Sequence, residues 1–180
     1  MVNGKEQPIR TDYRVVMDIF QAINDCELTN GEKAEVILKC LYEEFDDMNS
    51  DDLEEALKQA VWYLDGGDSP ARDSEAKKHY KMFDWEQDEK IIFSAINKVA
   101  GFEVREKQHL HWWTFLGFFN EIEEGLFTTV LGIRQKRAKR KKLEKWEQEF
   151  YRQNKALCDL VQRKTAEEQA EIDYWNKLLG

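Results

Sequence analysis

The scarcity of turn-forming residues is the feature that most constrains how this chain folds. Only two prolines and nine glycines occur in 180 residues. A protein built from short strands needs a turn signal about every 8–12 residues, and glycine and proline supply most of these signals. Apolar side chains instead recur every three or four residues, as on one face of a helix. We therefore predict an all-α protein: a compact multi-helix bundle with a long basic carboxy-terminal helical extension.

Signals at helix ends place the first helices. Thr29 with Glu32, and Asp84 with Gln87, have the spacing of a capping box, and Gly66, Gly67 and Gly101 follow apolar periodic runs as helix stops. From these signals we predict four helices, over 12–23, 29–45, 50–64 and 84–99. Between them we predict a surface loop over 68–83 and a short extended segment over 102–105.

The most apolar segment runs from Leu110 to Phe119. A helix that is apolar nearly all round is normally buried, so we expect this one at the centre of the core. Truncating Trp113 should then cost about 3–5 kcal/mol of stability. His109 and His111 are two residues apart and so point to different faces of a helix, which argues against a shared metal ion.

Charge is distributed unevenly. Residues 1–127 hold 14 Lys and Arg against 28 Asp and Glu, whereas residues 128–180 hold 13 against 8. We predict an acidic helical body over 1–127 and a basic helical arm with a terminal helix over 128–180. The arm is expected to be one long helix from Thr128 to about Arg163. A further capping box, Thr165 with Glu168, then precedes a terminal helix with an apolar face of Ile172, Trp175 and Leu178.

Within the arm, seven of the nine residues 134–142 are basic and none is strongly apolar. We expect this basic block to be solvated or bound to a partner, because it offers no apolar face to a core. Nucleic acid is one partner that such a block attracts, by release of counterions. No aromatic residues interleave with the block, and the acidic body would repel phosphate. We therefore favour an exposed, solvated face or an arm for an acidic protein partner, and a nucleic-acid-binding regulator is the alternative.

An apolar stripe follows the block at helical spacing. Such a stripe either folds back onto the body or forms a surface for a partner helix. Folding back onto the body is the usual fate of such a stripe; the partner surface is the alternative, since large aromatic side chains concentrate the binding energy of protein interfaces. The predicted partner-binding residues are Leu143, Trp146 and Phe150 of the stripe with Arg134, Lys136, Arg137, Lys139 and Arg140 of the block.

Residue patterns that carry chemistry are missing from the sequence. No HExxH, CxxC or glycine-rich phosphate loop occurs, and Cys26, Cys40 and Cys158 are widely spaced. We predict no catalytic, cofactor-binding or metal-binding residues and a nonenzymatic protein. The polar amino terminus and the absence of a long apolar run indicate a cytosolic protein that does not enter a membrane. Nothing in the sequence defines an oligomeric state.

Residues 109–125, HLHWWTFLGFFNEIEEG, resemble the most recognisable segment of the phage "gene product fifteen" family from siphophages of Gram-positive bacteria. The supporting motifs, in order, are IRTDYRVVMDIF at 9–20, AVWYLDGG at 60–67 and FDWEQDEKIIFSAI at 83–96. The resemblance runs from about residue 5 to about residue 135. The basic stretch and the helix predicted from Thr165 depart from the family pattern.

The resemblance implies a tail assembly chaperone in the host cytoplasm. Members of the family are encoded just before the tape-measure protein. The implied role is to hold that long helical protein soluble while tail-tube subunits are recruited, so the implied partners are the tape-measure and tail-tube proteins. A host-directed inhibitor that binds a bacterial protein would use the same surfaces, and it is a further alternative.

Overall fold

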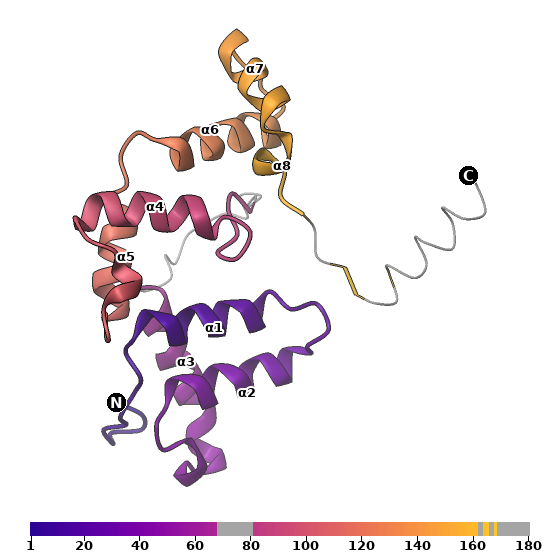
Figure 1. The fold of residues 1–180 in the computed structure, drawn as a ribbon. Helices are drawn as coiled ribbons and strands as arrows, with labels where there is room; N and C mark the ends of the chain where they lie inside the picture. Colours follow the sequence, from indigo (N-terminus) through magenta and orange to yellow (C-terminus); the bar gives the residue numbers. More distant parts are fainter. Residues whose placement is uncertain (68–80, 162–163, 166–167, 169–180) are drawn as a thin grey trace. The chain divides into compact units, whose positions relative to one another are not determined.

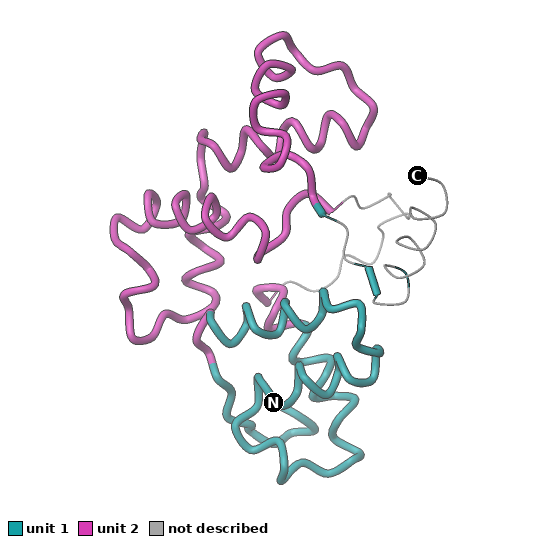
Figure 2. The backbone as a smooth tube through the Cα atoms, turned by 45° about the vertical axis from the view of Figure 1, so that its right-hand side comes forward, with its two compact units in different colours: residues 1–10, 14–61, 161–180 teal, residues 11–13, 62–160 magenta. Residues whose placement is uncertain are grey.

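A computed structural model describes residues 1–67, 81–161, 164–165 and 168. This part of the chain contains eight α-helices and no β-strand, which confirms the all-α prediction (Figure 1). It divides into two compact units, coloured separately in Figure 2. None of the described helices is long and apolar enough to span a bilayer.

Among the described residues, the first unit comprises 1–10 and 14–61, together with 161, 164–165 and 168. It contains most of three helices: α1 (Tyr13–Ile23), α2 (Asn30–Leu41) and α3 (Leu53–Leu64). The predicted capping box begins α2, because the Thr29 hydroxyl accepts from the Glu32 backbone N–H at 3.3 Å and the Glu32 carboxylate accepts from the Thr29 backbone N–H at 2.8 Å. The buried Tyr42 hydroxyl donates to the Ala56 carbonyl at 2.9 Å, which links the segment after α2 to α3.

Among the described residues, the second unit comprises 11–13, 62–67 and 81–160. Its helices are α4 (Glu89–Ala100), α5 (Trp112–Asn120), α6 (Leu126–Ala138), α7 (Lys145–Gln153) and the short α8 (Lys155–Cys158). Gly101 ends α4 in the left-handed conformation, with φ of 74°. The extended segment predicted over 102–105 is wrong: Val104–Glu106 form a 3-10 helix, whose first backbone N–H donates to the Asn97 side chain at 2.9 Å.

Two adjacent tryptophans on α5 have different environments. Trp112 is 1% exposed and its indole N–H donates to the Leu64 carbonyl at 3.0 Å. Trp113 is 39% exposed, stacks on Tyr63 and meets Trp62 edge-to-face. Successive helical residues are about 100° apart around the axis, so the two side chains point in different directions, and here only Trp112 is buried. The expectation that Trp113 lies at the core centre is therefore wrong, and Trp112 has that place.

The long helix predicted from Thr128 to Arg163 is also wrong. After α6 ends, Arg140 adopts a left-handed φ of 53°. The Lys141 backbone N–H donates to the Lys136 carbonyl at 2.7 Å and the Arg140 N–H to the Arg137 carbonyl at 2.9 Å. These are the two bonds of a Schellman motif, in which glycine usually occupies the left-handed position. Because an arginine occupies it here, the sequence contains no glycine to signal the helix end.

Some expectations fall outside the described residues. Most of the loop predicted over 68–83 does so, as does the apolar face of the terminal helix, Ile172, Trp175 and Leu178. The capping box before that helix is present, since Thr165 and Glu168 exchange two hydrogen bonds of 3.1 Å. The division into an acidic body and a basic arm at residue 127 stays a prediction.

Candidate partner-binding surface

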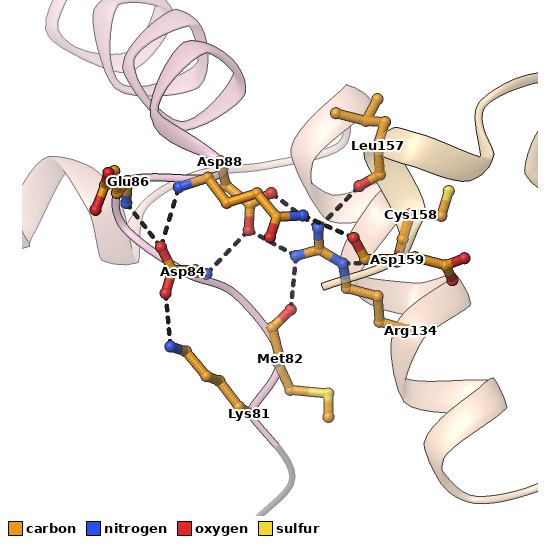
Figure 3. A network of polar contacts seen from close by, with 10 residues as sticks. Lys81, Met82, Asp84, Glu86, Asp88, Arg134, Leu157, Cys158 and Asp159 are labelled. Carbon is orange, nitrogen blue, oxygen red and sulfur yellow. Dashed lines mark hydrogen bonds and ion pairs between the residues drawn. The ribbon is translucent and has the colours of Figure 1, made fainter. Parts of the chain in front are cut away.

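Arg134, the first residue of the basic block, is buried inside the second unit. Its guanidinium pairs with both carboxylate oxygens of Asp88, at 2.6 and 2.8 Å, and the two side chains are 5% and 0% exposed. The remaining N–H groups donate to backbone carbonyls: Nε to Cys158, Nη1 to Met82 and Nη2 to Leu157, at 3.0, 3.0 and 2.8 Å (Figure 3). All five guanidinium donors are satisfied. The expectation that the whole block is solvated is wrong at Arg134, because a buried carboxylate compensates its charge.

The segment before α4 is shaped to present Asp88 to this arginine. Asp84 accepts from the backbone N–H groups of Glu86 and Gln87, each at 3.0 Å, and its own N–H donates to the Asp88 carboxylate at 3.0 Å (Figure 3). Burial alone would raise the pKa of Asp84, but the hydrogen bonds from Lys81 and from the backbone outweigh it, and the pKa is below its usual value. The predicted pairing of Asp84 with Gln87 is thus a carboxylate-stabilised turn that anchors the start of α4.

Lys136 and Arg137 are also paired within the second unit. The Lys136 ammonium donates to both oxygens of the buried Glu147 carboxylate, at 2.7 and 2.8 Å, and this bond lowers the pKa of Glu147. Arg137 pairs with Asp159, and its guanidinium lies 4.2 Å from the centre of the Tyr151 ring. These contacts join α6 to α7 and to the segment after α8.

The second half of the block is different. Lys139, Arg140, Lys141 and Lys142 are exposed, and none forms an ion pair with a residue in the described part of the chain. Trp146, on the first turn of α7, is 59% exposed. Leu143 and Phe150, the other two stripe residues predicted to bind a partner, are half-buried. The structure therefore gathers exposed cations and one exposed tryptophan around the turn between α6 and α7, which we call the basic turn (139–146).

Sequence reasoning missed the carboxylates that neutralise the first half of the block. Asp88, Glu147 and Asp159 are distant in sequence from their cationic partners, and only folding brings them together. One signal was available: Glu144 and Glu147 have capping-box spacing, and the Glu147 carboxylate accepts from the Glu144 N–H at 2.7 Å. This contact lies at the start of α7, within the range 128–163 for which a single helix is predicted.

The two histidines have structural roles. The His109 ring lies 3.1 Å from the Thr11 hydroxyl, and the His111 ring nitrogen Nδ1 caps α5 by accepting from the Trp113 backbone N–H at 3.1 Å. Among the described residues, no three His, Cys, Asp or Glu side chains are grouped so that they could hold a metal ion. Burial raises the pKa of the Cys158 thiol and that of Cys40, which disfavours the reactive thiolate.

These features define an all-helical protein with an exposed, tryptophan-bearing basic surface. The sequence matches the family described as Bacteriophage Gp15 protein over residues 1–160, and the chain belongs to that family. The match spans the basic block, α7 and α8, and the segment from Thr165 lies beyond it. Neither the curated proteins nor the solved structures contain a match to this chain.

Proposed function

We propose that this protein is a nonenzymatic tail assembly chaperone, which acts in the host cytoplasm. Its client is the tape-measure protein, held soluble while tail-tube subunits are recruited. The observation that carries the proposal is membership of the phage family together with the exposed basic turn. A long helical client presents apolar residues at spacings of three and four, and an exposed aromatic anchor is suited to bind them.

The client contact is proposed at Trp146, with Lys139 and Arg140 beside it and with Leu143 and Phe150 as half-buried neighbours. Arg134, Lys136 and Arg137 are engaged with carboxylates of the second unit, so in this proposal they support the surface and do not contact the client. The four cations at 139–142 suit a client segment with acidic flanks. The same charges would attract nucleic acid, but three of the seven cations of the block are neutralised internally.

Co-expression with the tape-measure protein of the same phage tests this function. We expect the client to stay soluble and to copurify with the parent protein. A pair of variants locates the contact: Trp146→Ala should reduce copurification, whereas Val61→Ala, at an exposed apolar residue of α3, should not. Insoluble client and no complex with the parent protein would refute the proposal. Retardation of duplex or single-stranded nucleic acid at low salt, lost on adding salt, would favour the regulator instead.

A further inference from the structure

A groove lies at the opposite end of α6 from the basic turn. It is lined by one side of α4 and by the connection from α5 into α6, with a cavity volume of about 490 Å³. Its apolar lining includes Val99 and Leu126, which are 37% and 49% exposed. Small-molecule and side-chain pockets in proteins typically measure about 300–1,000 Å³, so this groove is large enough to accept a tryptophan side chain.

Acidic residues surround this groove. Glu121, Glu123 and Glu124 line it and are exposed, and Lys98 is the single basic residue of the lining. The lining therefore carries a net charge of minus 2. None of the three glutamates forms an ion pair with a residue in the described ranges. An apolar groove with free carboxylates at its edge suits an apolar anchor that is flanked by cations.

The basic turn has the matching chemistry. Residues 139–146 contain five cations and one carboxylate, a net charge of plus 4, and end at the exposed Trp146. The two surfaces lie at opposite ends of one helix. Since α6 has 13 residues, its ends are separated by about 20 Å. Trp146 does not line the groove of its own chain.

We propose that the groove of one copy receives the basic turn of a second copy, with Trp146 as the anchor. Because the two surfaces differ and lie at opposite ends of α6, the contact is head-to-tail, and it produces a closed ring or an open chain of copies. One tryptophan and a few charges cover less area than a stable interface of about 800 Å² per partner, so the association is weak and depends on concentration. This self-association goes beyond the proposed client binding, although both use Trp146.

Sedimentation velocity on the full-length protein tests the proposal, from about 1 μM to about 1 mM, the range of weak association. We expect the sedimentation coefficient to rise with protein concentration and to rise less at high salt, because the contact pairs opposite charges. Two variants should each stay monomeric. Leu126→Asp places a charge in the groove at the first position of α6, where a carboxylate suits the helix dipole, and Trp146→Ala removes the exposed anchor.

Mixing the two variants gives the sharpest result. The Leu126→Asp chain keeps its basic turn and the Trp146→Ala chain keeps its groove, so the mixture should form one-to-one dimers that grow no further. A parent protein that stays monomeric over the whole range, or a mixture that stays monomeric, would overturn the proposal. If the parent never self-associates and Leu126→Asp loses the tape-measure client, the client occupies the groove and the proposal is again wrong.

The same variants distinguish this inference from the proposed function. Leu126→Asp leaves the basic turn intact, so as a monomer it should still copurify with the tape-measure protein. If the protein self-associates but has no effect on the solubility of the tape-measure protein, the chaperone proposal is wrong and the self-association proposal stands.

Discussion

The two halves of the basic block have similar composition and different surroundings. Arg134 is 6% exposed and gives every guanidinium N–H to an acceptor, whereas Lys139 and Arg140 are exposed and form no ion pair with the described residues. Arg134, Lys136 and Arg137 lie on α6, where they reach carboxylates of neighbouring segments. Lys139 and Arg140 lie where the helix has ended and the chain turns away.

This difference shows that a run of like charges is not one functional unit. A buried cation is tolerated where a carboxylate and additional acceptors surround it, and it then fixes the relative position of the segments that supply them. Three segments meet at Arg134: the stretch before α4, α6 itself and α8. The paired half of the block therefore holds α6 against α7, which carries Trp146, and against the segments around α8.

The largest expected effect is at Arg134. Arg134→Ala leaves the buried Asp88 carboxylate without its cation, and breaking a buried pair in this way costs about 3–5 kcal/mol. Urea denaturation measures this as a lower free energy of unfolding. Lys139→Ala is the matched control from the exposed half and should change stability by less than about 0.5 kcal/mol. Equal small losses for both variants would show that the halves do not differ.

The adjacent tryptophans on α5 differ in burial, as the two halves of the basic block do. Trp112→Ala removes a fully buried indole and should cost about 3–5 kcal/mol. Trp113→Ala should cost about 1–2 kcal/mol, since the partly exposed ring loses its contacts with the Tyr63 and Trp62 rings and one hydrogen bond to the Tyr63 carbonyl. Thermal denaturation followed by circular dichroism ranks the two, and a reversed ranking would contradict the assignment of the core.

The sequence predicted those helix ends that depend only on neighbouring residues. The Thr29 capping box and the Gly101 stop are where their signals indicated, because each depends on residues within one helical turn. The sequence did not predict features that depend on residues far apart in the chain. Arg134 is buried because it pairs with Asp88, which is 46 residues away, so the basic block alone does not predict its burial. The helix end before Arg140 was not predicted for a local reason: the left-handed position is held by an arginine and not by the glycine that usually signals it. The partner-binding role of Leu143, Trp146 and Phe150 stays a prediction.

Acidification should lower the free energy of unfolding, in part because it protonates Glu147, the carboxylate that pairs with Lys136 of the block. The bond from Lys136 lowers the pKa of Glu147, and Arg105 lowers that of Glu103 to about 2. A carboxylate with a lower pKa in the folded chain stabilises the fold above its unfolded pKa, and this contribution is lost as pH falls through the folded pKa. Urea midpoints should therefore fall between about pH 5 and pH 2.

Glu147→Gln tests whether the Lys136–Glu147 pair contributes to the pH dependence of stability. The variant should be less stable near neutral pH and should lose less stability on acidification, while Lys139→Ala follows the parent curve. A parent-like curve for Glu147→Gln would mean that the Lys136 pair does not contribute to the pH dependence.

The smallest expected effect is at the helix end. A left-handed conformation costs a non-glycine residue about 1–2 kcal/mol, and glycine loses about 0.5–1 kcal/mol more chain entropy on folding. Arg140→Gly should therefore raise the free energy of unfolding by about 0.5 kcal/mol. Lys139→Gly, at a residue with φ of −85°, relieves no strain and should lower it. Chemical denaturation of the two variants measures the difference, and a loss of stability in Arg140→Gly would argue against the Schellman motif.

Substitution of the block residue by residue, with stability and client binding measured on each variant, tests the central claim most directly. Arg134→Ala and Lys136→Ala should lower the melting temperature. Trp146→Ala combined with Lys139→Glu and Arg140→Glu should melt like the parent but bind the tape-measure protein at least about 30-fold more weakly, equivalent to about 2 kcal/mol. Unchanged client affinity in that triple variant, with the parent protein binding the client, would contradict the division of the block into a supporting half and a binding half.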